Sequence, residues 1–503
     1  MKNITKYIAL VFLSALVLGA CKKSYLETAP SNQVTVDVIF KTTEGAQTAL
    51  DGLYRLTYTF GIEDNGNHDL FGQKSFDLIM DLMGNDMVVN KQGYNWFNGD
   101  YRYSAGASTT DAGRSYTTWL YYYQVVNNAN SIITNIDAAA GIQDDKDKIK
   151  GQALFMRAHA YFYLVNFEQQ TYKGNESKPG IPMYSEPGVT GHPRGTVQNV
   201  YDSIVNDLTT AETLLTGKTR RDKSSVDVTT VQALRARVAM QMEDYTTAAT
   251  YAEKVINSQK YPLMNQATQT TNYLNGWNSL SNSEWMWGMQ VISDQATVYP
   301  SWFSHMDAEL TGEPGGYATL GQQKKITKAL YDQIDDNDIR KQAWIAPGDG
   351  NNYAPDYSQL KFHLADPSSW AGDYMYFSVA EMYLIDAEAL ARSSQDGPAQ
   401  TILNTLIRNR FPGYDATAFS GQALINEVLL QRRIELWGEG LALLDIKRLK
   451  TGLNRPTGAG NHGSGNFDPI VYTLPDQDPK FLYRIPQEEL NSNKSMTAAD
   501  QNP

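Results

Sequence analysis

The lone cysteine limits how this chain can hold itself together. Cys21 is the only cysteine among 503 residues, so no disulfide within the chain can stabilise a small core. A chain of this length can instead bury enough apolar surface for one large core or for two domains. We therefore expect a fold that is held together by packing between amphipathic elements.

The residues around Cys21 have the pattern of a lipoprotein signal. A positively charged start is followed by an apolar run over residues 8–18, which is shorter than the about 20 residues that a membrane-spanning helix needs. Leu18-Gly19-Ala20-Cys21 then forms a lipobox, in which small residues precede the thiol that accepts the lipid. We expect residues 1–20 to be a signal peptide, Cys21 to be lipidated and residues 21–35 to form a tether to the membrane.

Stripes of apolar residues at helical spacing cover much of the remaining chain. Residues 229–243 and 245–258 adjoin with only Asp244 between them, and alanines on both stretches allow the close helix pairing of tetratricopeptide repeats. Helices are expected over 42–58, about 74–83, 119–133, 149–170, 196–215 (with Thr196 as N-cap), 229–243, 245–258, 376–393, 395–410, 419–439 and 441–451.

Two long segments lack this periodicity. Residues 60–115 and 262–370 are rich in Gly, Asn and aromatic residues, and seven of the nine tryptophans lie in them. Long irregular segments within compact domains commonly carry function. The sequence therefore predicts a mostly α-helical fold, in which a tetratricopeptide-like scaffold supports a loop-rich, irregular ligand-binding part.

Charge and composition narrow the possible ligands. The chain has 43 Lys+Arg against 55 Asp+Glu, a net charge of −12, which repels phosphate backbones and argues against a nucleic-acid partner. The 31 tyrosines and 9 tryptophans exceed what a core alone needs, and aromatic rings lose little entropy on binding. Recognition by aromatic side chains is therefore expected.

An ordered set of short motifs resembles one known family. Residues 151–158 read GQALFMRA, residues 380–389 read AEMYLIDAEA and residues 432–440 read RRIELWGEG. In this order they resemble the SusD/RagB-like outer-membrane nutrient-binding lipoproteins, although Gln152 and Arg432 stand where that family commonly has Glu. The other members of the set are Tyr25-Leu26-Glu27 with Pro30, Trp119 with Asn127 and Asn130, Tyr161–Leu164, Asp207-Leu208 with Ala211, Ala233–Val238, Glu284–Gly288, Asp338-Ile339-Arg340, Leu403-Asn404 with Arg408, Asp445–Arg448, Ile485–Glu489, Asn491-Ser492-Asn493 and Gln501-Asn502-Pro503.

The resemblance implies a fold, a partner and a location. It implies a SusD-like fold, with an N-terminal helical part over 36–261 and a C-terminal part over 262–503 that holds ligand loops and further scaffold helices. It also implies a protein that captures oligosaccharides, or in some relatives peptides, and delivers them to a SusC-like TonB-dependent transporter. Some surface-exposed lipoproteins carry acidic residues directly after the lipidated cysteine, whereas Lys22-Lys23 follow Cys21 here. The outward-facing position in the outer membrane therefore rests on this resemblance alone. No cofactor is indicated, and a structural cation such as Ca²⁺ stays open.

Three aromatic loops are the candidate ligand contacts. A sugar ring presents an apolar CH face to an aromatic platform and a hydroxyl rim to amides or carboxylates, and these loops offer both kinds of group. The alternative for each ring is that it packs its loop onto the scaffold. The predicted ligand-binding residues are Tyr94, Asn95, Trp96, Asn98, Trp277, Tyr299 and Trp302.

The remaining chemical groups favour structural roles over catalysis. Glu435, Glu439 and Asp445 could form a glycoside-hydrolase pair, but their helical spacing beside arginines favours ion pairs between helices. The same structural role is expected for Glu381, Glu388, Arg157 and Arg408. The G-x-G-x-x-G at 458–463 lacks the strand and helix of a dinucleotide fold, and the six histidines show no metal-ligand spacing. A surface hydrolase, a peptide-capturing protein and a purely structural adaptor remain the alternatives.

Overall fold

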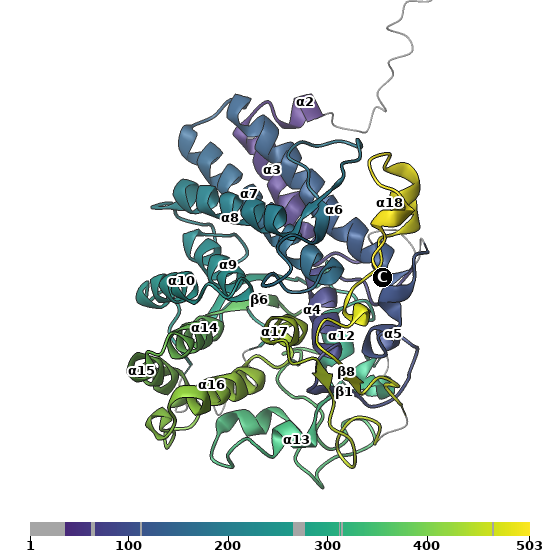
Figure 1. Cartoon of the computed structure of the whole chain (residues 1–503), viewed down its shortest axis with the longest axis vertical. Helices are drawn as coiled ribbons and strands as arrows, with labels where there is room; N and C mark the ends of the chain where they lie inside the picture. Colours follow the sequence, from purple (N-terminus) through teal and green to yellow (C-terminus); the bar gives the residue numbers. More distant parts are fainter. Residues whose placement is uncertain are drawn as a thin grey trace, which may run out of the picture.

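The computed structural model describes residues 36–61, 66–110, 113–264, 277–310, 312, 315–464 and 467–503. Cys21, the expected signal peptide at 1–20 and the expected tether at 21–35 lie outside these residues. Helices dominate the described part, and its strands form only two-stranded sheets. The fold is therefore the mostly α-helical one that the sequence predicts (Figure 1). None of its described helices is both long and apolar enough to cross a membrane.

The scaffold is a row of helices in which each packs against the next. Along this row α6 contacts α7, α7 contacts α8, α8 contacts α9, α9 contacts α10, and α10 contacts α14, which in turn contacts α15 and α16. These elements span α6 (Arg114–Asn135), α7 (Gln143–Glu168), α8 (Val197–Leu215), α9 (Val228–Gln241), α10 (Tyr245–Asn257), α14 (Val379–Arg392), α15 (Asp396–Ile407) and α16 (Gly421–Glu435). The predicted domain boundary at residue 262 falls between α10 and α14, which pack directly together, and it stays a prediction.

Some helices begin at a residue whose side chain caps them. Thr196 caps α8 as predicted, because its hydroxyl accepts from the Asn199 amide while the Asn199 side chain accepts from the Thr196 amide. Asp244 caps α10 by accepting from the Thr247 amide. Buried Ala248 and Ala252 then present little bulk where α10 meets its neighbours. The predicted close pair α9–α10 is confirmed.

Several predicted helix boundaries differ from the structure, and for two of them the reason can be identified. Residues 376–378 belong to β6 (Tyr374–Ser378), which pairs antiparallel with β4 (Trp285–Met289), so that α14 starts only at Val379. α16 stops at Glu435 because Gly438 has φ +81°, and a Cβ there would lie 2.4 Å from the Phe362 ring.

The remaining helices and strands are mostly short. The helices are α2 (Val36–Ile39), α3 (Thr43–Arg55), α4 (Gln73–Leu82), α5 (Asn98–Tyr101), α12 (Trp302–Met306), α13 (Lys328–Tyr331), α17 (Ala442–Leu449) and α18 (Gln487–Ser492). The strands form three antiparallel pairs, which are β1 (Met87–Val89) with β5 (Lys324–Ile326), β2 (Pro179–Pro182) with β3 (Arg194–Thr196), and β7 (Leu453–Asn454) with β8 (Thr473–Leu474). Single-turn helices are η2 (Ala105–Ala107), η3 (Ile136–Ala138), η4 (Ala318–Gln322), η5 (Ile339–Ala343), η6 (Ala416–Ala418), η7 (Pro479–Phe481) and η8 (Ala498–Asp500).

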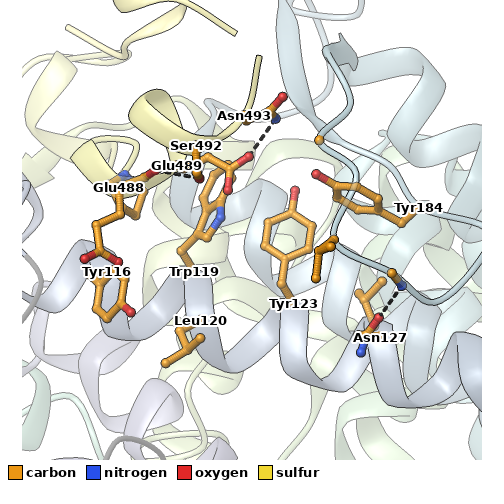
Figure 2. Close-up of a pocket in the computed structure, with 15 residues that line it drawn as sticks. Tyr116, Trp119, Leu120, Tyr123, Asn127, Tyr184, Glu488, Glu489, Ser492 and Asn493 are labelled. Atoms are coloured by element: carbon orange, nitrogen blue, oxygen red, sulfur yellow. Dashed lines mark hydrogen bonds between the residues drawn. The ribbon is translucent and has the colours of Figure 1, made fainter. Parts of the chain in front are cut away.

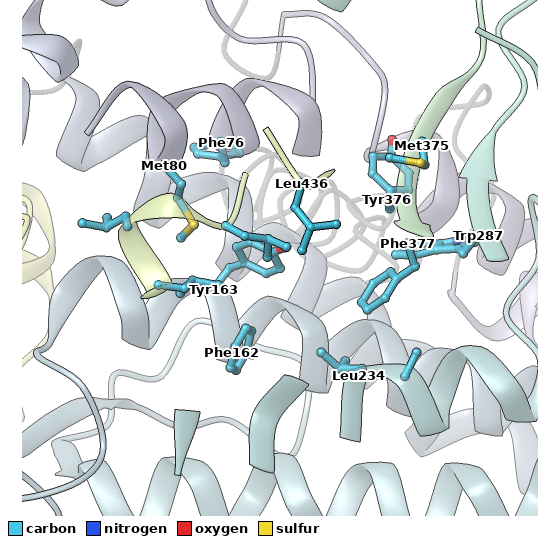
Figure 3. Close-up of a cluster of buried hydrophobic side chains, with 14 of the residues drawn as sticks. Phe76, Met80, Phe162, Tyr163, Leu234, Trp287, Met375, Tyr376, Phe377 and Leu436 are labelled. Carbon is cyan, nitrogen blue, oxygen red and sulfur yellow. The ribbon is translucent and has the colours of Figure 1, made fainter. Parts of the chain in front are cut away.

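One core joins the scaffold to the irregular part. Phe162 and Tyr163 on α7 lie in the same buried cluster as Phe76 on α4 and Trp287 on β4 (Figure 3). Trp285 and Trp287 are fully buried, so this strand faces the core. Because segments far apart in the sequence share this core, the scaffold can fix the position of loops from the irregular part.

Buried ion pairs link the helices, as the spacing of the acids predicts. Arg410 bonds both Glu284 and Glu435, and Arg340 also bonds Glu435 at 3.1 Å. Lys361 pairs with Glu439 at 2.7 Å. The further pairs are Arg448–Glu388, Arg448–Asp445, Arg237–Glu381 and Arg157–Asp207. The predicted structural role of these acids and of Arg157 is confirmed.

Arg408 is the exception among the residues predicted to form such pairs. Its side chain is half exposed and pairs with equally exposed Asp415 at 3.4 Å. Arg410, two residues further on, holds the buried position instead. The helix α15 ends at Ile407, so the periodicity that assigned Arg408 to the helix interface no longer applies.

Candidate ligand-binding site

Six rings from four separate segments gather on one part of the surface. We call this group the aromatic platform, and its members are Phe60, His68, Tyr94, Trp96, Tyr299 and Tyr317. Most of them are half-buried, Tyr94 is 67% exposed and Tyr317 is buried beneath them. The platform therefore combines a fixed base with ring surface that solvent can reach.

His68 lies at the centre of the platform. Its ring stacks on Trp96 with centroids 5.4 Å apart and on Tyr299 with centroids 5.9 Å apart. Its Nδ1 shares a hydrogen bond of 2.5 Å with the hydroxyl of Tyr317, whose pKa is raised by burial. These contacts hold the three rings in a preformed arrangement, so a ligand need not order them.

The Trp96 loop is fastened to the rest of the protein by one amide. The side-chain nitrogen of Gln322 donates to the carbonyls of Gln92 (2.7 Å) and Trp96 (3.2 Å). Gly93 permits this approach, because it has φ +54° and a Cβ there would lie 2.3 Å from the Gln322 side chain. The loop conformation thus depends on a contact between residues far apart in the sequence.

Asn95 and Asn98 play different parts in this loop. Asn98 is 1% exposed and donates to the Gln92 carbonyl (2.8 Å) and to the Asn95 side-chain oxygen (3.0 Å). Asn95 is exposed beside Trp96. Of these two predicted ligand contacts, Asn95 is placed to meet a hydroxyl rim, whereas Asn98 supports the loop from below.

A polar recess of about 170 Å³ borders the platform. Arg114 lies in it and forms ion pairs with Asp69 (2.5 Å) and Asp100 (3.1 Å), while the Tyr483 hydroxyl donates to Asp100 at 2.9 Å. Burial raises the pKa of Asp100, and the charge of Arg114 opposes that rise. Both carboxylates are therefore engaged by one guanidinium, which leaves an array of fixed hydrogen-bonding groups beside the rings.

Trp277 and Trp302, predicted as ligand contacts, are buried instead. Trp302 is 1% exposed, with the Lys74 ammonium 4.1 Å from its ring centroid. Trp277 is 2% exposed, with the Lys361 ammonium at 4.3 Å. Neither ring offers a face to solvent, so the prediction is corrected and both tryptophans anchor their loops to the core. Asn275, in the same predicted loop as Trp277, lies outside the described residues.

Sequence reasoning missed three members of the platform. Phe60 belongs to the aromatic and glycine-rich segment that the composition marks as irregular, and Tyr317 belongs to the second such segment. Histidine spacing gives no signal for His68, because its partners are Trp96, Tyr299 and Tyr317. Within the described residues, no group of three or more His, Cys, Asp or Glu side chains is arranged to hold a metal ion.

Comparisons with known proteins match both halves of the chain. A family model described as starch-binding and associating with the outer membrane matches residues 25–240, and a model of the SusD family matches residues 366–503. The chain belongs to the SusD/RagB-like family. This family binds glycans, and its association with the outer membrane agrees with the fold and the motifs above.

Sequence relatives match all or part of this SusD-like protein, and solved structures share its fold. SusD-like protein P2 of Formosa agariphila is 24% identical over 95% of this chain and 97% of its own length, and protein P25 of that organism is 22% identical over 58% and 52%. A SusD-like carbohydrate-binding protein from Bacteroides vulgatus is 27% identical, with a TM-score of 0.79 over 92% of this chain and 98% of its own. Surface glycan-binding protein A of Bacteroides thetaiotaomicron, solved with laminarihexaose, shares the fold at 18% identity, with a TM-score of 0.66 over 92% and 99%.

Proposed function

We propose that this protein captures an oligosaccharide on the cell surface and delivers it unchanged to a SusC-like TonB-dependent transporter. The observation that carries the proposal is the aromatic platform, in which Trp96, His68 and Tyr299 form a preformed, solvent-reachable ring surface. Membership of a glycan-binding family and the laminarihexaose complex of a neighbour of the same fold support it.

The platform suits the two faces of a sugar. Trp96 and Tyr299 can cover the apolar CH faces of successive rings, and exposed Tyr94 can extend the surface. Asn95 and the recess with Asp69 offer donors and acceptors to the hydroxyl rim. Each contact suits binding, and none positions a nucleophile at the rings.

The proposed delivery role also needs the membrane. Acyl chains on Cys21 would anchor the protein stably, since each buried methylene contributes about 0.8 kcal/mol. The lipobox and the family association with the outer membrane support an anchored protein beside a transporter.

Binding without turnover separates this proposal from its alternatives. Calorimetry on the mature protein with neutral oligosaccharides (laminarihexaose among them), acidic oligosaccharides and peptides should give saturable binding to one oligosaccharide class. Chromatography should then recover the ligand unaltered. Cleaved product would establish a surface hydrolase, and binding to peptides alone would establish the peptide-capturing alternative.

A matched pair of substitutions locates the site. Trp96→Ala should weaken binding about five- to thirtyfold, because the loss of one platform ring removes on the order of 1–2 kcal/mol. Tyr353→Ala is the control, since Tyr353 is 54% exposed and lies outside the platform. Equal effects of the two substitutions would contradict the assignment of the site.

A further inference from the structure

A second aromatic cavity lies along α6, away from the platform. It has a volume of about 370 Å³ and lies between α6, the segment 183–192 and α18 (Figure 2). We call it the α6–α18 groove, and its principal side chains are Tyr116, Trp119, Tyr123, Tyr184, Glu488 and Glu489. It shares no residue with the aromatic platform, so it needs a separate explanation.

A row of rings forms the floor of the groove. The rings of Trp119 and Tyr123 have centroids 4.8 Å apart, and Tyr184 meets Tyr123 edge-on at 5.5 Å. The Tyr123 hydroxyl donates to the Pro182 carbonyl at 2.7 Å, which fixes its ring. Figure 2 shows these rings pointing from α6 and the 183–192 segment into the space below α18. The groove is therefore preformed.

The charge of the groove favours a cationic ligand. Glu488 and Glu489 lie on α18 beside Tyr116 and Trp119, and none of the residues that line the groove is a lysine, arginine or histidine. Glu489 accepts from Asn493, whereas the Glu488 carboxylate has no partner among the described residues. Aromatic faces and carboxylates both attract a cationic group.

The rim of the groove adds one apolar side chain. Val189 lies on it and is fully exposed, although Gly188 beside it is held by a 3.0 Å hydrogen bond from its amide to Asn127. Val189 therefore offers an apolar contact to a segment that binds in the groove.

A protein in the membrane beside the lipid anchor can reach the groove. In Figure 1, α6 and α18 lie toward the same end of the molecule as α2, the first described helix. The 15 residues from Cys21 to the start of α2 can span at most about 50 Å, so a membrane protein beside the proposed lipid anchor can meet this end. We infer that the α6–α18 groove docks an arginine- or lysine-bearing segment of a protein partner in the membrane.

Short peptides that differ in one charge test this inference. Acetyl-Leu-Arg-Gly-amide and its citrulline counterpart have nearly the same shape, and only the first is cationic. Titrated into the mature protein, the arginine peptide should bind at least fivefold more tightly, and the difference should shrink as salt is added. Glu488→Gln should remove most of that preference, and Val189→Lys should weaken it by repulsion.

Two further variants keep the result interpretable. Glu253→Gln removes an exposed charge on α10 and should leave the preference unchanged. Trp96→Ala should also leave it unchanged, so that failure of the groove and failure of the proposed glycan site can be told apart. The inference is overturned if the two peptides bind equally, if Glu488→Gln has no effect, or if a neutral or amino-sugar oligosaccharide occupies the groove instead.

Discussion

At the scale of single residues, burial decides which aromatic side chains can meet a ligand. Trp96 and Trp302 both lie in aromatic loops, yet Trp302 is covered by Lys74, which is 228 positions away in the sequence. Loop composition predicts that rings are present, but not which ring a distant side chain will cover. The sequence therefore predicts Tyr94, Trp96 and Tyr299 as candidates, and it cannot separate them from Trp277 and Trp302.

Gln322 gives a test of the loop's support. Gln322→Ala removes the hydrogen bonds to the Gln92 and Trp96 carbonyls, so the Trp96 loop should lose its fixed position. We expect a three- to tenfold weaker affinity for the oligosaccharide in calorimetry, with little change in Tm. Unchanged affinity would show that the platform does not depend on this contact.

Asp386 makes the stability of the protein depend on pH. It is fully buried on α14, neither carboxyl oxygen has a hydrogen-bond partner among the described residues, and burial, with a smaller contribution from Glu253, raises its pKa to about 7. The unfolded carboxyl ionises near pH 4, so this group lowers stability progressively as pH rises from about 4 to about 7. Asp386→Asn should therefore leave the free energy of unfolding unchanged near pH 4 and raise it by at least about 1 kcal/mol at pH 8.

Denaturant unfolding of the two proteins at pH 4 and pH 8 measures this difference. Asp294→Asn, a substitution of an exposed aspartate, is the control and should shift neither value. A gain in stability from Asp386→Asn that is equal at both pH values would contradict an ionised, unpaired carboxyl.

At the scale of elements, apolar periodicity predicts the helices, and local capping chemistry predicts some of their ends. The Thr196 cap of α8 can be predicted from the sequence, because capping joins residues that are three positions apart. The strand β6 cannot be predicted from the sequence, because its pairing with β4 joins residues about 90 positions apart. Both of its faces are buried, so it also lacks the alternation of apolar and polar residues that is typical of strands. Sequence thus predicts local order well and long-range pairing poorly.

The neighbouring arginines after α15 test the role of buried ion pairs. Arg410→Gln should lower the free energy of unfolding by about 3–5 kcal/mol, because Glu284 and Glu435 would keep buried negative charge without their main partner. Arg408→Gln breaks only an exposed pair and should cost less than about 1 kcal/mol. Chemical denaturation measures both, and similar costs would contradict the assigned difference in burial.

At the scale of the whole molecule, the row of helices fixes the position of the loops, and the proposed lipid on Cys21 would hold the protein at the membrane. One core joins α7, α4 and β4, and Trp96 packs against it, so the platform is tied to the scaffold. If Cys21 carries the lipid, Cys21→Ala should move the protein from the membrane fraction to the soluble fraction of the cell envelope. Oligosaccharide affinity of the purified variant should stay the same, and continued membrane association would contradict the anchor.

The central claim is that the aromatic platform holds the sugar, and a crystal structure with the best-binding oligosaccharide tests it most directly. We predict a sugar ring with its CH face against Trp96 or Tyr299, an intact glycosidic bond and a hydroxyl within hydrogen-bond distance of Asn95. An oligosaccharide bound elsewhere, in the α6–α18 groove for example, or a cleaved product beside Asp69 and Asp100, would contradict this account.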